Sequence, residues 1–189
     1  MYRRQYLKGI VSAFSIVGVA FSSIPFIRSL KIGRWRAGDF DLEIDISNLT
    51  PDKPIITEWF GTPITIIRRT SAEIKELAAS NEGLLDPYSE SSQQPTEAQN
   101  IYRSIKPDVL VYVPLCTHLG CKVSKIAKDD PSMSFRKNWP GGFNCPCHGS
   151  DFDMAGRVYK NMPAPLNLAI PPHKYINENK ILLSLKLIT

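Results

Sequence analysis

The sequence predicts a mainly β protein, in which one N-terminal transmembrane helix precedes a small antiparallel β domain that carries a helix-and-loop insertion. Three observations lead to this prediction. An uncharged apolar run occupies residues 9–27, several short β-branched runs follow it, and a polar stretch at 70–104 interrupts those runs. At 189 residues the chain is long enough for one domain with its own core and an anchor.

The apolar run from Gly9 to Ile27 is long enough to cross a membrane. As a helix it spans roughly 28 Å at about 1.5 Å per residue, close to the hydrocarbon core of roughly 30 Å. Residues 3–8, RRQYLK, resemble the twin-arginine signal that exports folded proteins. A basic segment without a clear A-x-A site follows the run, which favours an uncleaved signal-anchor. We therefore expect residues 1–30 to be a signal-anchor and transmembrane helix, with the rest of the chain exported.

The net charge of +5 does not indicate a nucleic-acid partner. Seven of the 23 basic residues flank the apolar run, and the other sixteen face eighteen acidic residues. The seven are Arg3, Arg4, Lys8, Arg28, Lys31, Arg34 and Arg36. Basic residues beside a transmembrane run suit anionic lipid head groups, and no basic and aromatic stripe recurs later. We expect a membrane-embedded protein that binds no nucleic acid.

Residues 31–39 contain two glycines and several charges, so we expect a flexible neck there, followed by the folded domain at 40–189. Strands of that domain are expected at 40–46, 53–60, 62–69, 108–114 and 181–187. Gly61 should join the second and third strands as a hairpin. The last strand should pair with the stretch near Tyr175 across the turn NENK.

A helix is expected at 70–80, because this segment begins like a capping box. Thr70 or Ser71 would be the N-cap, with Glu73 or Ile74 three positions later. The following residues, 81–100, are polar and poor in core residues, so we expect a surface excursion.

Two short stretches, CTHLGC at 116–121 and CPCHGS at 145–150, hold all four cysteines and two of the three histidines. Two disulfides are one interpretation, although they would not need the histidines. A structural zinc site is another, but mixed C-x-H and C-x2-H pairs are unusual for zinc and leave two cysteines over. The pattern is that of a Rieske centre, a 2Fe–2S cluster in which two histidines replace two cysteines on one iron. We favour this interpretation.

The chain resembles the Rieske subunits of the quinol–cytochrome c reductases, the cytochrome bc complexes, of the bacterial respiratory type. The resemblance includes both motifs, the anchor and neck, the inserted DPYSESSQQPTEAQN at 86–100, and MPAPLNL at 162–168, which is similar to the family's proline loop. It covers nearly the whole chain. It implies a Rieske-type antiparallel β fold with a small cluster-binding subdomain at about 114–166.

The resemblance also implies a role for each site residue. Cys116 and Cys145 would ligate one iron, and His118 and His148 the other. Cys121 and Cys147 would form a disulfide that ties the two loops together. Residues around the cluster or on the docking surface would be Leu119, Gly120, Gly149, Ser150, Phe152, Pro163, Ala164 and Pro165.

The ligand types predict a raised reduction potential. Two ferric ions, two sulfides and two thiolates sum to zero charge, whereas four thiolates would leave the oxidised cluster with two negative charges. An electron enters the neutral cluster more easily. Ser150 would donate a hydrogen bond to a sulfide and raise the potential further. Phe152 stands where mitochondrial members have a tyrosine, so we expect a lower potential than theirs.

The resemblance implies an electron-transfer subunit of a quinol–cytochrome c reductase that contributes to proton translocation. Quinol would be the substrate, hydrogen-bonded to His148 as the catalytic residue. A b-type and a c-type cytochrome would be the partners in a dimeric complex of the bacterial inner membrane, with the Rieske domain on the periplasmic side. A membrane-anchored Rieske carrier outside such a complex is the alternative. An oxygenase component would need a second site with two histidines, and only His173 is left.

Two further expectations concern residues outside the motifs. Twenty-six residues separate His118 from Cys145, and the polar segment at 125–142 within that interval should be an exposed insertion. His173 lies far from both motifs and should be an ordinary surface residue.

Overall fold

The computed structural model describes residues 2–29, 41–79, 81–133 and 138–188. The chain divides into two units, 1–39 and 40–189, each of which is described by itself. The first contains one helix, α1 (Tyr2–Ser29). Its segment Tyr2–Pro25 has a mean hydropathy of 1.7 and is long and apolar enough to cross a membrane. The neck predicted at 31–39 lies outside the described residues.

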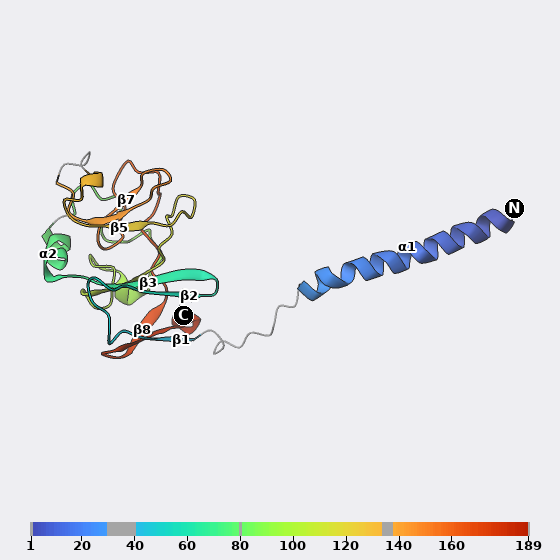
Figure 1. Cartoon of the computed structure of the whole chain (residues 1–189), viewed down its shortest axis with the longest axis horizontal. Coiled ribbons are helices and arrows are strands. Elements are labelled where there is room, and N and C mark those ends of the chain that lie inside the picture. The colour runs from blue at the N-terminus through green and yellow to red at the C-terminus, as the bar shows by residue number, and fades with distance from the viewer. Residues whose placement is uncertain (1, 30–40, 80, 134–137, 189) are drawn as a thin grey trace. The chain divides into compact units, whose positions relative to one another are not determined.

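Three small antiparallel sheets make up the second unit, and Figure 1 shows them one above another. The first has the order β1-β9-β8, and its strands are Leu42–Asp45, Lys180–Leu183 and His173–Asn177. The second has the order β2-β3-β4, with strands Ile55–Trp59, Thr62–Arg68 and Val109–Tyr112. The third has the order β5-β6-β7, with strands Ser124–Ile126, Gly142–Asn144 and Asp151–Phe152. The prediction of a mainly β, antiparallel domain is confirmed.

Both faces of the middle sheet are buried, because its side chains point alternately to a core on one face and a core on the other. Ile64 and Ile66 of β3 pack into an aliphatic core with the β1-β9-β8 sheet. Ile67 of β3 and Tyr112 of β4 point to the opposite core, which contains Phe143 and the residues around the two motifs. Successive strand residues face opposite sides of a sheet, so one strand serves both cores.

The predicted hairpin and helix are both present. β2 and β3 pair directly, and the two residues between them, Phe60 and Gly61, both have positive φ, as a tight hairpin turn requires. Helix α2 (Ser71–Ala79) begins with a reciprocal capping box. The Thr70 hydroxyl accepts from the Glu73 N–H at 3.2 Å, and the Glu73 carboxylate accepts from the Thr70 N–H at 2.7 Å.

The C-terminal strand is shorter than predicted. β8 and β9 pair across the turn as expected, but β9 ends at Leu183 and a 3₁₀ helix, Leu185–Ile188, follows. The Ser184 hydroxyl accepts from the Lys186 N–H at 3.3 Å, which favours this turn over a continued strand. Two other 3₁₀ helices occupy Thr96–Ala98 and Pro131–Met133.

One prediction of exposure is wrong, and two hold only in part. In the supposed surface excursion at 81–100, Leu84, Ser89 and Ala98 are buried, because this segment packs along the chain that leads into residues 162–168. In the insertion at 125–142, Trp139 is buried, although residues 134–137 lie outside the described part of the chain. The prediction that His173 is a surface residue is wrong, because its side chain is buried. Each segment looked exposed because its polar residues outnumber its apolar ones.

Candidate metal centre

The two motifs form loops with the same backbone hydrogen bonds. In the first, the Cys116 N–H donates to the carbonyl of Cys121 at 2.8 Å, and the Gly120 N–H donates to the carbonyl of Cys116 at 2.9 Å. The second loop repeats both bonds at the equivalent residues, from Cys145 to Ser150 and from Gly149 to Cys145, at the same distances. The sequence repeat is therefore also a repeat of conformation.

Each loop depends on its glycine. Gly120 and Gly149 have φ of 77° and 72°, which a residue with a Cβ rarely adopts. Open space surrounds both positions, so backbone conformation and not crowding requires glycine there. The N–H groups of both glycines donate to cysteine carbonyls of their own loops.

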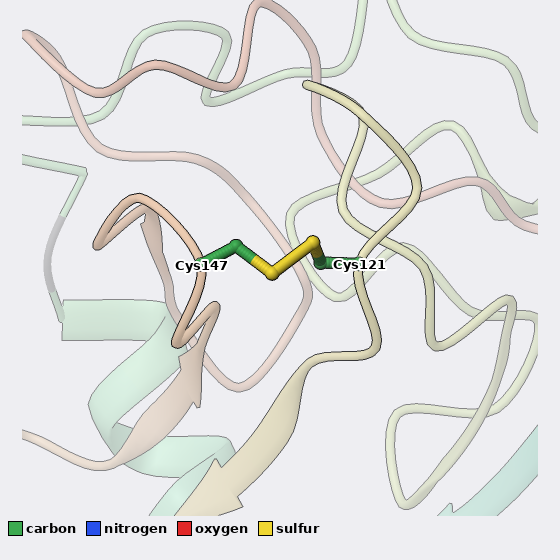
Figure 2. Close-up of a disulfide and its surroundings, with 2 residues drawn as sticks. All are labelled: Cys121 and Cys147. Carbon is green, nitrogen blue, oxygen red and sulfur yellow. A yellow bond between two sulfur atoms is a disulfide. The ribbon is translucent and has the colours of Figure 1, made fainter.

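Cys121 and Cys147 form the predicted disulfide, which joins the two loops (Figure 2). The bond removes these two cysteines from any set of metal ligands. The Cys145 sulfur lies within 4.8 Å of both disulfide sulfurs, so the cross-link sits directly beside a free thiol. The alternative of two disulfides is wrong, because Cys116 and Cys145 are free.

Cys116 and Cys145 are the two free cysteines, and both are buried. Burial raises the pKa of the Cys116 thiol, while hydrogen bonds from the His118 backbone N–H and from Ser150 act in the opposite direction. Buried thiolates need a positive partner. A bound cation beside these two sulfurs would supply it.

The two motif histidines lie together at the loop tips. Their ring centroids are 4.8 Å apart with the planes nearly perpendicular. His118 is half-buried, and its Nδ1 is enclosed without a hydrogen-bond partner among the described residues. His148 is exposed. An enclosed ring nitrogen without a partner is costly in a folded protein and is explained by a metal ligated there.

Residues 162–168, called the proline loop from here on, contact both ligand loops. The Ser150 hydroxyl is buried and accepts a hydrogen bond from the Ala164 N–H at 3.0 Å. The Thr117 hydroxyl donates to the Leu166 carbonyl at 2.6 Å. Thr117 was not predicted from the sequence, where a threonine between cysteine and histidine carries no signal of its own.

The predicted docking residues divide into exposed and buried ones. Leu119 is 71% exposed, and Pro163 and Pro165 are also exposed. Ala164 between the two prolines is buried, as its bond to Ser150 requires. An apolar tip of this kind beside an exposed histidine is suited to an apolar partner.

Phe152 is fully buried and belongs to the core that includes both free cysteines. It pairs with Phe143 across strands β6 and β7. These strands approach closely at Gly142, where an added Cβ would lie 2.0 Å from the Phe152 carbonyl oxygen. The strand that leads out of the second ligand loop is thus held rigidly against the strand that leads into it.

Three buried arginines support the site without facing it. Arg69 donates to the carbonyls of Tyr102, Pro107 and Met154. Arg103 donates to the carbonyls of Ala155 and Gly156, and Arg157 forms a buried ion pair with Asp153. Burial lowers the pKa of Arg69 to about 10, so it stays charged at neutral pH. Sequence reasoning missed these residues, because nothing local distinguishes a buried arginine from a surface one.

Comparison with known proteins identifies the family. The model of the Rieske [2Fe-2S] domain matches residues 88–172. The ubiquinol-cytochrome c reductase iron-sulfur subunit of Allochromatium vinosum is 41% identical over 96% of this chain and 87% of its own length. The corresponding subunit of Rhodospirillum rubrum is 35% identical over 96% of this chain and 91% of its own length. The chain belongs to this family of iron-sulfur subunits.

A mitochondrial protein and a solved structure are also similar to this chain. The mitochondrial Rieske subunit of the cytochrome b-c1 complex of Solanum tuberosum is 36% identical over 85% of this chain and 53% of its own. A solved chain titled "Hyperthermophilic respiratory Complex III" covers 90% of this chain at 24% identity, with a TM-score of 0.47. The family assignment depends on the sequence relatives alone.

The residues present fit a Rieske 2Fe–2S cluster. Such a cluster needs two thiolates and two imidazoles. The chain offers two free buried thiols and two adjacent imidazoles, and the enclosed Nδ1 of His118 has no hydrogen-bond partner among the described residues. The two loops lie far apart in the sequence, and the disulfide joins them through two cysteines that are 26 positions apart.

Proposed function

We propose that this protein is the membrane-anchored iron-sulfur subunit of a quinol–cytochrome c reductase and takes the first electron of quinol oxidation. The observation that carries the proposal is the pairing of two free buried thiols with an exposed histidine in a member of this family. A bound 2Fe–2S cluster with histidine ligands supplies a one-electron acceptor of raised potential.

In this proposal Cys116 and Cys145 ligate one iron, and His118 and His148 the other. The burial of both thiols and the exposure of the His148 ring support this division. The disulfide and the glycine-dependent loop backbones hold the four ligands in place before substrate arrives.

His148 is the residue that meets quinol. Its exposed ring can accept a hydrogen bond from a quinol hydroxyl and hold the proton that leaves with the electron. Leu119, Pro163 and Pro165 surround the approach with apolar surface, which excludes water and suits a quinone ring. Thr117 and Ser150 hold the proline loop in position for this contact.

Family membership implies cytochrome partners, and we infer their kind. A b-type cytochrome would present quinol, and a c-type haem would receive the electron, within a dimeric complex. Helix α1 is the membrane anchor. The twin-arginine resemblance supports a single-pass protein of the bacterial inner membrane with its Rieske domain in the periplasm, where a disulfide persists.

The proposed domain organisation follows the same scheme. Residues 1–30 are the signal-anchor, 31–39 the neck, and 40–189 the Rieske domain, with a cluster-binding subdomain at about 114–166. The neck would let the domain move between quinol and haem. Locking it should leave the cluster spectrum intact and abolish turnover.

Low-temperature electron paramagnetic resonance of ascorbate-reduced membranes tests the proposal. A rhombic signal typical of a histidine-ligated cluster, together with co-purification of b- and c-type haems, is expected. The same signal without haems would support the alternative, a Rieske carrier outside a cytochrome bc complex. A featureless spectrum from membranes that contain the protein would refute both.

A further inference from the structure

The segment 83–94, called the bracket here, lies behind the proline loop and contacts the chain that leads into it. The Lys160 N–H donates to the carbonyl of Gly83 at 2.7 Å, and the Leu85 N–H donates to the carbonyl of Val158 at 2.9 Å. These two bonds align the start of the bracket antiparallel to the entry of the proline loop. The bracket is therefore part of the cluster end of the domain.

One side chain connects the bracket to the far end of the proline loop. Asn167 is 2% exposed, and its Oδ1 accepts from the Val158 N–H at 2.8 Å. Its Nδ2 donates to the Asp86 carbonyl at 2.9 Å and to the Ser89 hydroxyl at 3.1 Å. A single amide thus ties together the entry of the loop, its exit and the bracket.

A serine hydroxyl forms a second connection at the same place. Ser92 donates to the Asp86 carboxylate at 2.9 Å and accepts from the backbone N–H of Asn167 at 3.3 Å. The Asp86 carboxylate also accepts from the N–H groups of Glu90 and Ser91, at 2.8 and 3.1 Å. This carboxylate holds the turn that presents Ser89 and Ser92, together with a bond of 2.6 Å from the Gln94 amide to the Ser89 carbonyl.

The backbone at Ser89 indicates that the turn is held under strain. Ser89 is fully buried and has φ of 58°, a left-handed conformation that non-glycine residues seldom adopt. Such a conformation persists only where the surrounding contacts enforce it. Here the Asn167 amide is one of those contacts.

The end of the proline loop also bonds to the chain before it, since the Leu168 N–H donates to the Gly156 carbonyl at 2.8 Å. On the side of the ligand loops, the Leu166 carbonyl accepts from Thr117 and the Ala164 N–H donates to Ser150. We propose that Asn167, Ser89 and Ser92 are positioning residues, which press the proline loop onto the ligand loops and so keep the quinol-docking tip in shape. The docking part of this inference depends on the proposed function, whereas the mechanical part does not.

Hydrogen exchange measured by mass spectrometry on the purified membrane complex tests the mechanical part. In the Ser92→Ala variant, the Ala164 amide, which donates to Ser150, should exchange about five- to thirty-fold faster, the factor expected when a local opening loses one or two buried hydrogen bonds. Exchange in β3 should not change. Turnover per assembled cluster should fall, with iron content unaltered.

The neighbouring Ser91→Ala variant is the matched control, because this side chain is exposed and only its backbone N–H contacts Asp86. It should leave exchange at Ala164 and turnover unchanged. Ser89→Ala removes a single acceptor from Asn167 and provides a milder second variant. Unchanged exchange at Ala164 in both buried-serine variants would overturn the inference. So would equal acceleration in β3, or failure of both variants to assemble the cluster, since either result would make the network part of the general core.

If exchange rises but turnover per cluster stays normal, the bracket holds the loop without serving quinol docking, and the functional half of the inference is refuted. Failure of the proposed function would give a different result. The unmodified complex would then not oxidise quinol, while the Ser92→Ala substitution would still accelerate exchange at Ala164.

Discussion

The two ends of the folded unit at residues 40–189 are built in different ways. At the base, strands of four to seven residues enclose an aliphatic core of Ile, Leu and Val residues. At the cluster end, strands β5, β6 and β7 have only two or three residues, and the core contains cysteine, methionine and aromatic residues. Most of the fully buried polar side chains lie there, such as Ser150, Arg157 and Asn167.

The difference follows from backbone hydrogen bonding. Long strands satisfy their own N–H and C=O groups, so only apolar contacts are needed between sheets. Short strands and loops leave many backbone groups that side chains must satisfy. Hydrogen bonds are directional, and a network of them fixes atoms more closely than apolar packing does. The cluster end thus gains a defined geometry for its ligands, and the base gains stability.

Removing a ligand should have the largest effect and should leave the base intact. Cys116→Ala is expected to abolish the cluster and turnover completely, because a methyl group cannot ligate iron. Iron analysis and electron paramagnetic resonance of membranes would measure this, with the exposed Ser124→Ala of β5 as the control. Normal iron content in Cys116→Ala would contradict the ligand assignment.

Removing the disulfide should weaken the link between the two loops. The double variant Cys121→Ser with Cys147→Ser opens a cross-link between residues 26 positions apart, worth about 3–4 kcal/mol on the chain-entropy model. The midpoint of cluster loss on heating should fall by about 10 °C. Visible circular dichroism during heating would follow it. A midpoint unchanged within about 2 °C would show that side-chain hydrogen bonds alone hold the loops.

A hydroxyl added at Phe152 should raise the potential of the cluster. The ring lies in the same core as both free cysteines, so the Phe152→Tyr oxygen would add a donor beside the ligand sulfurs. A hydrogen bond worth about 1.4 kcal/mol to the reduced form corresponds to about 60 mV. A redox titration monitored by circular dichroism measures the shift. An unchanged or lowered potential would refute the expectation.

The smallest effect is expected at the base, where His173 should make stability depend on pH. Burial lowers the pKa of His173, with Pro171 and Glu97 acting in the opposite direction. The unfolded chain therefore binds a proton at a higher pH than the folded one. Stability should be full above about pH 6.5 and decline as the pH falls below that value.

Thermal unfolding at several pH values would measure this decline, and the His173→Gln variant should lose part of it. Equal slopes for the variant and the unmodified protein below pH 6.5 would assign the dependence to other groups. The cluster signal should be unaffected at neutral pH in either protein, which separates this effect from those at the cluster end.

Much of this protein was determined by local sequence. An uncharged run predicts α1, Gly61 predicts the hairpin, Thr70 with Glu73 predicts the start of α2, and the paired motifs predict the site. Each of these depends on residues close together in the chain, where periodicity, capping and ligand spacing have direct physical meaning.

Only the tertiary structure decided which polar residues are buried. Asn167 and Asp86 are 81 residues apart and meet through a hydrogen bond. His173 is buried, with its Nδ1 at 2.8 Å from the Pro171 carbonyl oxygen. The sequence does not distinguish a hydroxyl, amide or imidazole that hydrogen-bonds to a distant residue in the core from one that hydrogen-bonds to solvent. For this reason the bracket at 83–94 was predicted to lie on the surface. Its buried side chains form their hydrogen bonds with residues that only the folded chain brings close to it.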